Sequence, residues 1–171
     1  MAIATADRYR LFWLVPALLA VHNAEEAVTF PDYLPRVPER LPEIWRSVGG
    51  AITPGQVWAA LAVVTLIPFA LAAWAALRPD QAAPVWLLLL VQATVLLNVV
   101  WHVSAAIVVF AGYAPGLVTA VCLNLPFSIY LFRRAAKEDW VSPRARWALL
   151  PSAVAMHGPV LWGVLSLAAR L

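Results

Sequence analysis

Long apolar runs constrain this chain more than any other feature of its sequence. No Asp, Glu, Lys or Arg occurs within residues 55–77, 84–112 or 147–169. Each run exceeds the roughly 20 residues with which a helix crosses a hydrocarbon core about 30 Å thick. Only helices and closed barrels satisfy every backbone polar group in lipid. The runs lack the alternation of barrel strands, so they predict an all-α integral membrane protein.

Two further runs extend this prediction to a bundle of about five transmembrane helices in a single membrane domain, residues 1–171. Only 12% of the residues are charged, which is about half the usual share in soluble domains. The stretch 31–54 contains several prolines and charged residues, and we interpret it as an extramembrane loop. The expected spans are residues 9–30, 55–77, 84–112, 114–133 and 147–169.

Five spans divide the 12 basic residues unequally between the two sides of the membrane. Eight share the side of the N-terminus: Arg8, Arg10, Arg78, Arg133, Arg134, Lys137, Arg144 and Arg146. The other side holds Arg36, Arg40, Arg46 and Arg170. Because cytoplasmic segments carry an excess of Lys and Arg, we expect the N-terminus inside and the C-terminus outside. Topology thus explains the net charge of +3, and nucleic acid is not an expected partner.

The first span contains ionisable residues in the stretch VHNAEEA, residues 21–27. His22, Glu25 and Glu26 share one helical face, because residues three and four apart are neighbours. An acidic residue at the centre of a membrane helix costs about 2.5–3.5 kcal/mol, and two adjacent carboxylates also repel each other. The middle of the spans contains no Lys or Arg. A metal ion, protonation, or an arginine folded back from the 36–46 loop is therefore expected to stabilise the pair.

The other two histidines of the chain are expected at a depth similar to that of His22. Spans one, three and five run in the same direction, and His102 and His157 lie near or past the middle of spans three and five. On span three, Thr94, Asn98 and His102 follow each other at intervals of four residues and form one polar stripe. Asn98 is thereby expected to orient water or to polarise a substrate.

These residues predict a divalent metal site with catalytic capacity. Catalytic zinc takes three protein ligands and keeps a further position open, and a neighbouring carboxylate can act as general base. Zinc is favoured; a pair of irons or manganeses ranks second, because the Glu-x-x-His order usual in such bundles is reversed here. Either glutamate can complete the shell while the other moves protons. The predicted metal ligands are His22, Glu26, His102 and His157, and the predicted catalytic residues are Glu25, Glu26 and Asn98.

The sequence also resembles a known family. VHNAEE resembles the motif that names the HXXEE proteins, which are small bacterial and archaeal multi-span membrane proteins. The family pattern has an Asn-x-x-x-His element and a Pro-Gly pair, matched here by NVVWH at 98–102 and PG at 115–116. The resemblance covers roughly residues 9–133 and leaves His157 outside. It implies a prokaryotic cytoplasmic-membrane protein with an enzyme-like site, and it supplies no established reaction.

Three functions are compatible with this pattern. The first is a membrane-embedded, metal-dependent enzyme, of hydrolase type, whose lipid or apolar small-molecule substrate enters between the spans. The alternative is a small proton-coupled transporter in which Glu25, Glu26 and the membrane histidines relay protons. A redox subunit that binds haem or a quinone through two histidines is the third, and it leaves the glutamates unexplained.

Overall fold

The computed structural model describes residues 2–34, 53–78, 81–160, 163–164 and 167. All regular structure within these ranges is helical. Most of the predicted loop 31–54 lies outside the described residues, as do the loop arginines considered as partners of the glutamates. The helices are α1 (Ala2–Tyr33), α4 (Pro54–Leu77), α5 (Ala82–Val108), α6 (Leu117–Thr119), the π-helix η2 (Ala120–Asn124), α7 (Leu125–Lys137), α8 (Pro143–Ala155) and the π-helix η3 (Met156–Val160).

The predicted all-α bundle of about five helices is confirmed, since α6, η2 and α7 form one continuous run and α8 continues into η3. Three helices of the described chain are long and apolar enough to cross a membrane: Asp7–Tyr33, Pro54–Leu77 and Ala82–Val108. They coincide with the first three predicted spans, although the third ends at Val108 and not at 112. The fourth and fifth predicted spans correspond to the interrupted runs 117–137 and 143–160.

Prolines account for the two π-helical interruptions. Pro126 has no N–H and cannot donate to a carbonyl of the preceding turn. The chain widens there, and the N–H of Leu125 donates to the carbonyl of Ala120 five residues earlier. Pro159 lies within η3, where the same widening occurs. Such π-helical turns are frequent at functional sites, and both lie close to polar residues of the bundle interior.

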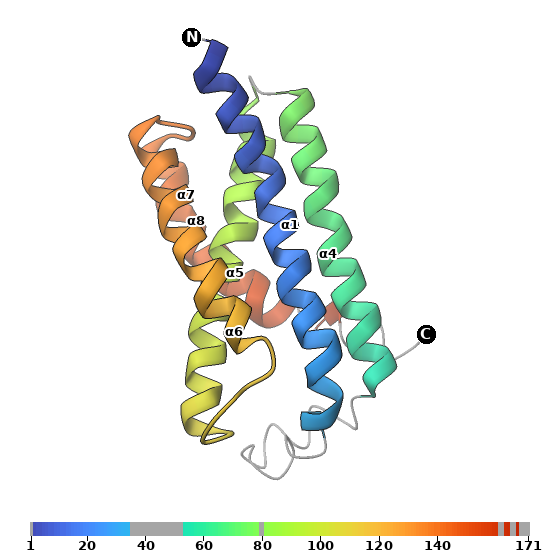
Figure 1. Ribbon diagram of the computed structural model, residues 1–171. Helices are drawn as coiled ribbons and strands as arrows, with labels where there is room; N and C mark the ends of the chain where they lie inside the picture. The colour runs from blue at the N-terminus through green and yellow to red at the C-terminus, as the bar shows by residue number, and fades with distance from the viewer. Residues whose placement is uncertain (1, 35–52, 79–80, 161–162, 165–166, 168–171) are drawn as a thin grey trace.

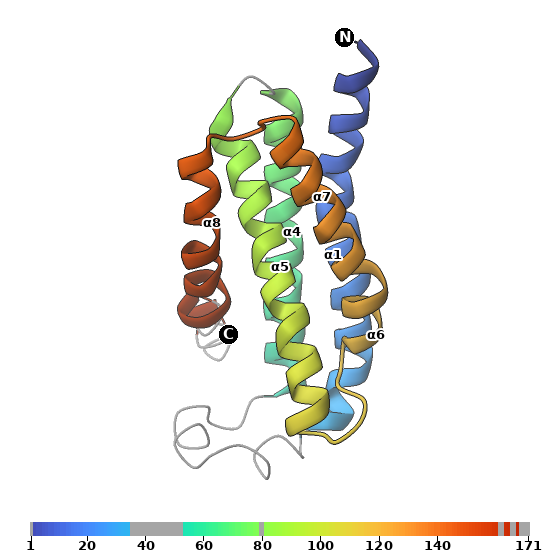
Figure 2. The ribbon, with the colours of Figure 1, turned by 90° about the vertical axis from the view of Figure 1, so that its left-hand side faces the viewer.

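Helix α5 lies at the centre of the bundle. It contacts α1, α4, α7 and α8, and Figures 1 and 2 show α8 on the side of α5 away from α1. An apolar core packs around the first half of α5, with Phe12, Val15, Leu88, Leu89 and Leu131 almost fully buried. A smaller apolar cluster of Ala105, Ala106 and Ala114 lies at the C-terminal end of α5 and in the loop that follows it. Asn98 and His102 of α5 lie between these two cores.

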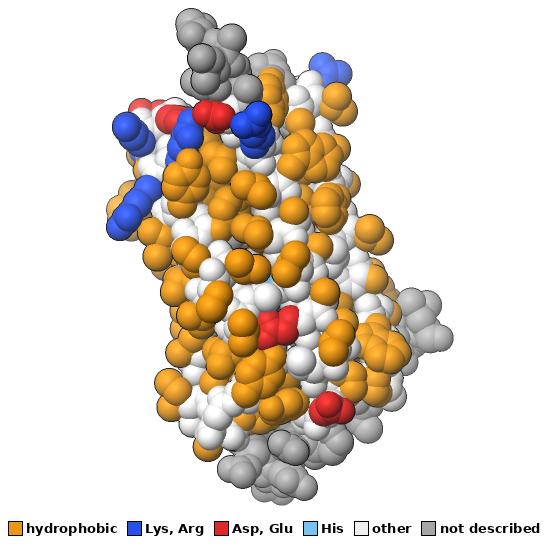
Figure 3. Space-filling view, in the orientation of Figure 1, with side chains coloured by type: hydrophobic (Ala, Val, Ile, Leu, Met, Phe, Trp, Pro, Cys, Tyr) orange, Lys and Arg blue, Asp and Glu red, His pale blue; other side chains and the backbone are white. Residues whose placement is uncertain are grey.

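Basic residues of the described chain gather at one end of the bundle. Basic side chains occur where α1 begins, α4 ends, α7 ends and α8 begins. Figure 3 shows Lys and Arg at the end that carries the N-terminus, above a largely hydrophobic face. The distribution is that of a membrane protein whose lipid-facing middle is apolar.

Candidate metal centre

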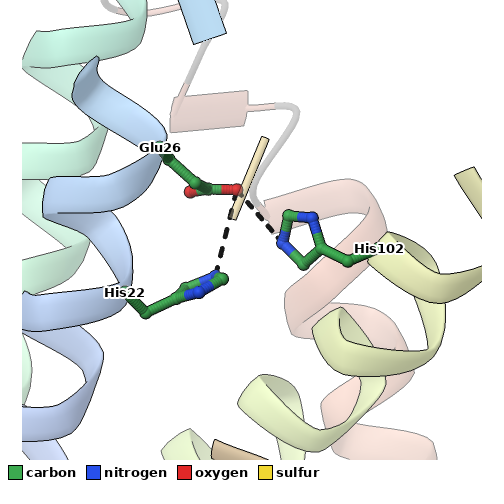
Figure 4. A group of neighbouring side chains, drawn as sticks. All are labelled: His22, Glu26 and His102. Carbon is green, nitrogen blue, oxygen red and sulfur yellow. Dashed lines mark ion pairs between the residues drawn. The ribbon is translucent and has the colours of Figure 1, made fainter. Parts of the chain in front are cut away.

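Side chains from α1 and α5 approach one another between the two apolar cores (Figure 4). The Oε1 atom of Glu26 lies 3.2 Å from Nε2 of His102 and 3.9 Å from Nε2 of His22. One potential ligand atom from each of the three residues lies within 4.8 Å of the others. The two imidazole rings meet edge to face, with centroids 4.9 Å apart. The group has the donor atoms and the spacing to hold a metal ion.

Helical spacing and packing together position these groups. His22 and Glu26 are one turn apart on α1 and so project in the same direction, toward the neighbouring α5 that carries His102. His22 is fully buried and 4% of the surface of His102 is exposed, whereas 15% of the Glu26 side chain is exposed. The two imidazoles are therefore shielded, and the carboxylate forms the accessible edge of the group.

Asn98 joins all three histidines of the chain. Its Nδ2 atom lies 2.9 Å from Nε2 of His22 and 2.9 Å from Nε2 of His102. Its Oδ1 atom lies 3.1 Å from Nε2 of His157 in η3. His157 thus lies outside the group of His22, Glu26 and His102 and is connected to it through the Asn98 amide. Its place among the metal ligands stays a prediction.

Glu25 lies outside the group of His22, Glu26 and His102, and its carboxylate is surrounded by hydrogen-bond donors. Its carboxylate accepts hydrogen bonds from the hydroxyl of Tyr113 (2.5 Å) and the backbone N–H groups of Val118 (3.2 Å) and Thr119 (2.8 Å). A fourth bond comes from the Thr119 hydroxyl at 2.5 Å. Two of the four donors are backbone N–H groups that cannot accept, and hydrogen bonds donated to a carboxylate favour its ionised form. Burial and donation to Glu25 raise the pKa of Tyr113, which keeps that hydroxyl a donor.

Thr119 connects Glu25 to His22 and determines which imidazole nitrogen carries a proton. Nδ1 of His22 lies 2.9 Å from the Thr119 hydroxyl oxygen. Since that hydroxyl donates its only proton to Glu25, Nδ1–H of His22 must donate to it. Nε2 then keeps its lone pair and faces the group. Metal-binding histidines commonly donate their second N–H to an oxygen in this way.

Gly116 closes the site from the loop between α5 and α6. Its φ angle is +79°, a conformation in which glycine is favoured because it has no Cβ. A Cβ atom there would lie 2.8 Å from both Cγ of Glu26 and Cε1 of His22, and 2.9 Å from Cε1 of His102. The backbone at this position therefore packs directly on all three members of the group.

A family model with the description "Protein of unknown function with HXXEE motif" matches residues 13–131. The match covers more than half of the 171 residues. The chain belongs to the HXXEE family. The matched part of this HXXEE protein includes Glu25 and Asn98 together with His22, Glu26 and His102, but not His157. No curated protein and no solved structure matches the chain.

Three contributors to the site in this HXXEE protein were not predicted as site residues: Tyr113, Gly116 and Thr119. Gly116 was noticed only as part of the Pro-Gly pair. Thr119 follows that pair by three residues, at the start of a helical run whose first N–H groups have no partner within the helix. The N–H groups at such a helix start need an acceptor, and Glu25 is a carboxylate in the membrane that needs donors. The sequence could have predicted this pairing.

Proposed function

We propose that this HXXEE protein is a membrane-embedded, metal-dependent enzyme of hydrolase type that acts on a lipid or another apolar substrate. The observation that carries the proposal is the approach of two imidazole nitrogens and one carboxylate oxygen to within 4.8 Å, from His22, His102 and Glu26. They lie within helices that are long and apolar enough to cross a membrane. Ionisable groups at that position are costly, and they are typical of functional sites.

The donor set fits a divalent metal. Two histidines and one glutamate are a catalytic zinc set with a further position open. Thr119 accepts the Nδ1–H of His22, so the lone pair on Nε2 faces the group. Histidine ligands of metal ions commonly donate their second N–H to an oxygen in this way. When bound, the metal polarises a carbonyl group and lowers the pKa of water to about 7. We favour zinc, with iron or manganese as alternatives.

The residues of the site would have separate roles. His22, His102 and Glu26 would hold the ion, and Glu25 would orient His22 through the hydroxyl of Thr119. Glu26 is the partly exposed member of the group, so its carboxylate is also placed to accept or return a proton. Glu25 is engaged by four donors and is therefore better suited to positioning than to proton transfer.

The position of the group favours a substrate that reaches it through the bilayer. Trp101, next to His102 on α5, is 53% exposed, and its neighbours Val100 and Val103 are exposed as well. In a membrane these side chains contact lipid. These outward side chains face away from the buried His102, so access to the group is at the partly exposed Glu26 carboxylate. A lipid or an apolar small molecule can reach that carboxylate without crossing water, whereas a polar solute would have to leave water first.

An iron-dependent oxidoreductase is the second candidate function. Two histidines and one carboxylate with open positions are also the ligand set of non-haem iron oxygenases. The donor atoms of His22, Glu26 and His102 are therefore compatible with a zinc hydrolase and with an iron oxidoreductase. A proton-coupled transporter is less well supported. The Asn98 amide lies between the histidines, and an amide does not take up and release protons as a relay requires.

Metal analysis of the purified protein tests the proposal. We expect about one equivalent of zinc, iron or manganese per chain, and its loss in both Glu26→Gln and His22→Ala. Asn23→Ala is the matched control, because Asn23 adjoins His22 but its side chain bonds to Thr65 of α4. Folded wild-type protein that takes up none of the three metals would contradict the proposal and favour transport. Hydrolysis of lipid esters in liposomes by the metal-loaded protein, and not by Glu26→Gln, would establish the reaction class.

We also propose that the basic end of the bundle faces the cytoplasm of a prokaryote, with the N-terminus inside and the C-terminus outside. The excess of Lys and Arg at that end supports this orientation. A reporter enzyme that is active only outside the cytoplasm, fused after residue 171, is expected to be active. The same reporter fused before residue 1 is expected to be inactive, and the reverse pattern would contradict the orientation.

A further inference from the structure

The side-chain amide of Asn98 occupies the centre of the polar site. One of its ends, Nδ2, lies 2.9 Å from Nε2 of both His22 and His102, and the other end, Oδ1, lies 3.1 Å from Nε2 of His157. Among the described residues, Asn98 is the one whose side chain makes a polar contact with all three histidines. The role of Asn98 therefore depends on which of its two ends faces the pair of histidines when the site is filled.

If Glu26 is a carboxylate, the hydrogen bonds around His102 cannot all be made without a cation. Its Nε2 atom lies 2.9 Å from Nδ2 of Asn98 and 3.2 Å from Oε1 of Glu26. This nitrogen can accept a hydrogen bond from the Asn98 N–H through its lone pair, or it can carry a hydrogen and donate to a Glu26 carboxylate. A single imidazole nitrogen does one or the other. Together with the lone pair on Nε2 of His22, the group has more acceptors than protons, and a cation would satisfy them all.

The position of the Asn98 amide end matches that of a ligand. Metal bonds of about 2.0–2.1 Å at angles from about 90° to 110° put neighbouring ligand atoms roughly 2.9–3.4 Å apart. The two separations of 2.9 Å between Asn98 Nδ2 and the imidazole nitrogens fall at the lower end of this range. An amide nitrogen does not bind such ions, but a carbonyl oxygen does.

A half-turn of the amide about its Cβ–Cγ bond exchanges the oxygen and the nitrogen with little movement of either position. The oxygen would then face His22 and His102, and the N–H groups would face His157. Nε2 of neutral His157 can accept such a bond when the proton lies on Nδ1. The half-turned arrangement therefore removes the conflict at His102 and keeps the contact to His157.

We infer that Asn98 binds the metal through its amide oxygen in the loaded protein, and that His157 is a positioning residue that accepts an N–H bond from the turned amide. The loaded site would then contain two nitrogen ligands and two oxygen ligands, from His22, His102, Glu26 and Asn98. This inference rests on the proposed function. It gives His157, which lies outside the residues matched by the family model, the role of orienting Asn98 as a metal ligand.

Cobalt(II) and zinc titrations of the purified full-length protein test the inference. We expect Asn98→Ala to weaken binding of both ions at least about tenfold, which is the lower range for loss of an outer-shell partner, and to shift the visible absorption of bound cobalt. Asn98→Asp keeps an oxygen at the position, so it should bind cobalt at least as tightly as wild type, again with a shifted spectrum. Asn23→Ala and Asn23→Asp are the matched controls and should leave affinity and spectrum unchanged.

His157 is tested by a pair of variants. His157→Gln offers an amide oxygen that can accept the Asn98 N–H bond, and it should retain near wild-type cobalt affinity. His157→Ala removes the acceptor, so we expect a roughly tenfold loss of cobalt affinity, the lower end for loss of an outer partner, with the cobalt spectrum retained because His157 is not itself a ligand. A spectrum in His157→Ala that shifts as far as in Asn98→Ala would instead make His157 a ligand and overturn its assigned role.

The possible failures are distinguishable. Wild-type affinity and an unshifted cobalt spectrum in Asn98→Ala would overturn the inference and leave the proposed metal centre intact. If Asn98→Ala does not fold, loss of cobalt binding by folded Asn98→Asp would overturn it equally. Wild-type protein that binds neither ion would overturn the proposed function itself.

Discussion

Two polar regions lie next to each other on α1, one facing α4 and the other facing α5. They differ in whether their hydrogen-bond donors and acceptors are equal in number. Toward α4, the Asn23 amide donates to the Thr65 hydroxyl at 2.6 Å, which donates to the carbonyl of Leu61 at 2.6 Å. Each donor in this chain meets one acceptor. Toward α5, His22 faces a group with more acceptors than protons. The first arrangement joins helices in lipid, whereas in the second the proposed cation would supply the missing partner, so we expect the balance of donors and acceptors to distinguish a structural polar contact from a site.

The strongest test of this comparison replaces the two adjacent residues in turn. We expect His22→Ala to lower zinc affinity by more than about 100-fold, since it removes a ligand and exceeds the 10–100-fold effect of losing an outer partner. Asn23→Ala should leave zinc affinity unchanged and lower the free energy of unfolding by about 0.6–1.7 kcal/mol. Zinc titration and unfolding in mixed micelles measure the two effects. Equal loss of zinc affinity in both variants would abolish the distinction.

Gly116→Ala tests whether the loop must pack directly on the site. The new Cβ would meet three side chains of the group at 2.8–2.9 Å, at a residue with φ of +79°. Backbone strain and overpacking are expected to cost about 2–4 kcal/mol of unfolding free energy together and to weaken zinc binding. Gly112→Ala, in the same loop but with its nearest neighbour at 3.9 Å, is the control. Equal unfolding free energies of the two variants would show that the loop backbone can move to accommodate the new Cβ at little cost.

Thr119→Val removes the link between His22 and Glu25 while retaining the shape of the side chain. Nδ1–H of His22 loses its acceptor and the tautomer is no longer determined, so we expect zinc affinity to fall about 10–100-fold. Thr119→Ser keeps the hydroxyl and should retain most of the affinity. Thr65→Val makes the same change on the α4 side, where zinc affinity should not respond. A loss in Thr65→Val as large as in Thr119→Val would contradict the assigned role of Thr119.

The smallest expected effect concerns a second chain of hydrogen bonds in the bundle interior. The Gln92 amide donates to the Ser128 hydroxyl at 2.7 Å, and Ser128 donates to the Asn124 carbonyl at 2.7 Å. Because these bonds are paired one to one, Ser128→Ala should lower the unfolding free energy by about 1 kcal/mol and leave zinc affinity unchanged. A fall in zinc affinity would extend the site beyond Asn98 along α5.

Much of the site was predictable because it follows from local periodicity. The i, i+4 spacing of His22 and Glu26 and that of Asn98 and His102 put each pair on one helical face, and both pairs occur together in the structure. The similar depth of His157 was also expected from the common direction of spans one, three and five. Depth does not determine distance, however, and the structure puts Nε2 of His157 on Asn98 rather than among the three grouped ligand atoms.

The two glutamates show where periodicity is insufficient. Glu25 and Glu26 differ by about 100° around α1, and the sequence left open which of them faces the histidines. Packing decides between them, because α5 lies on the side of Glu26 and the start of the α6 run lies on the side of Glu25. The donors of Glu25 come from residues some 90 positions away, and no local pattern relates them.

The sequence by itself determined the helical class, the apolar spans, the one-sided distribution of basic residues and the pairs of polar residues on α1 and α5. These follow from composition and from the period of a single helix. Only the tertiary structure decided that Glu26 faces the histidines, that Thr119 orients His22, that Gly116 must lack a side chain and that one amide joins three histidines. The physical reason is that each of these depends on the distance between atoms on different helices, which is determined by packing and not by spacing along the chain.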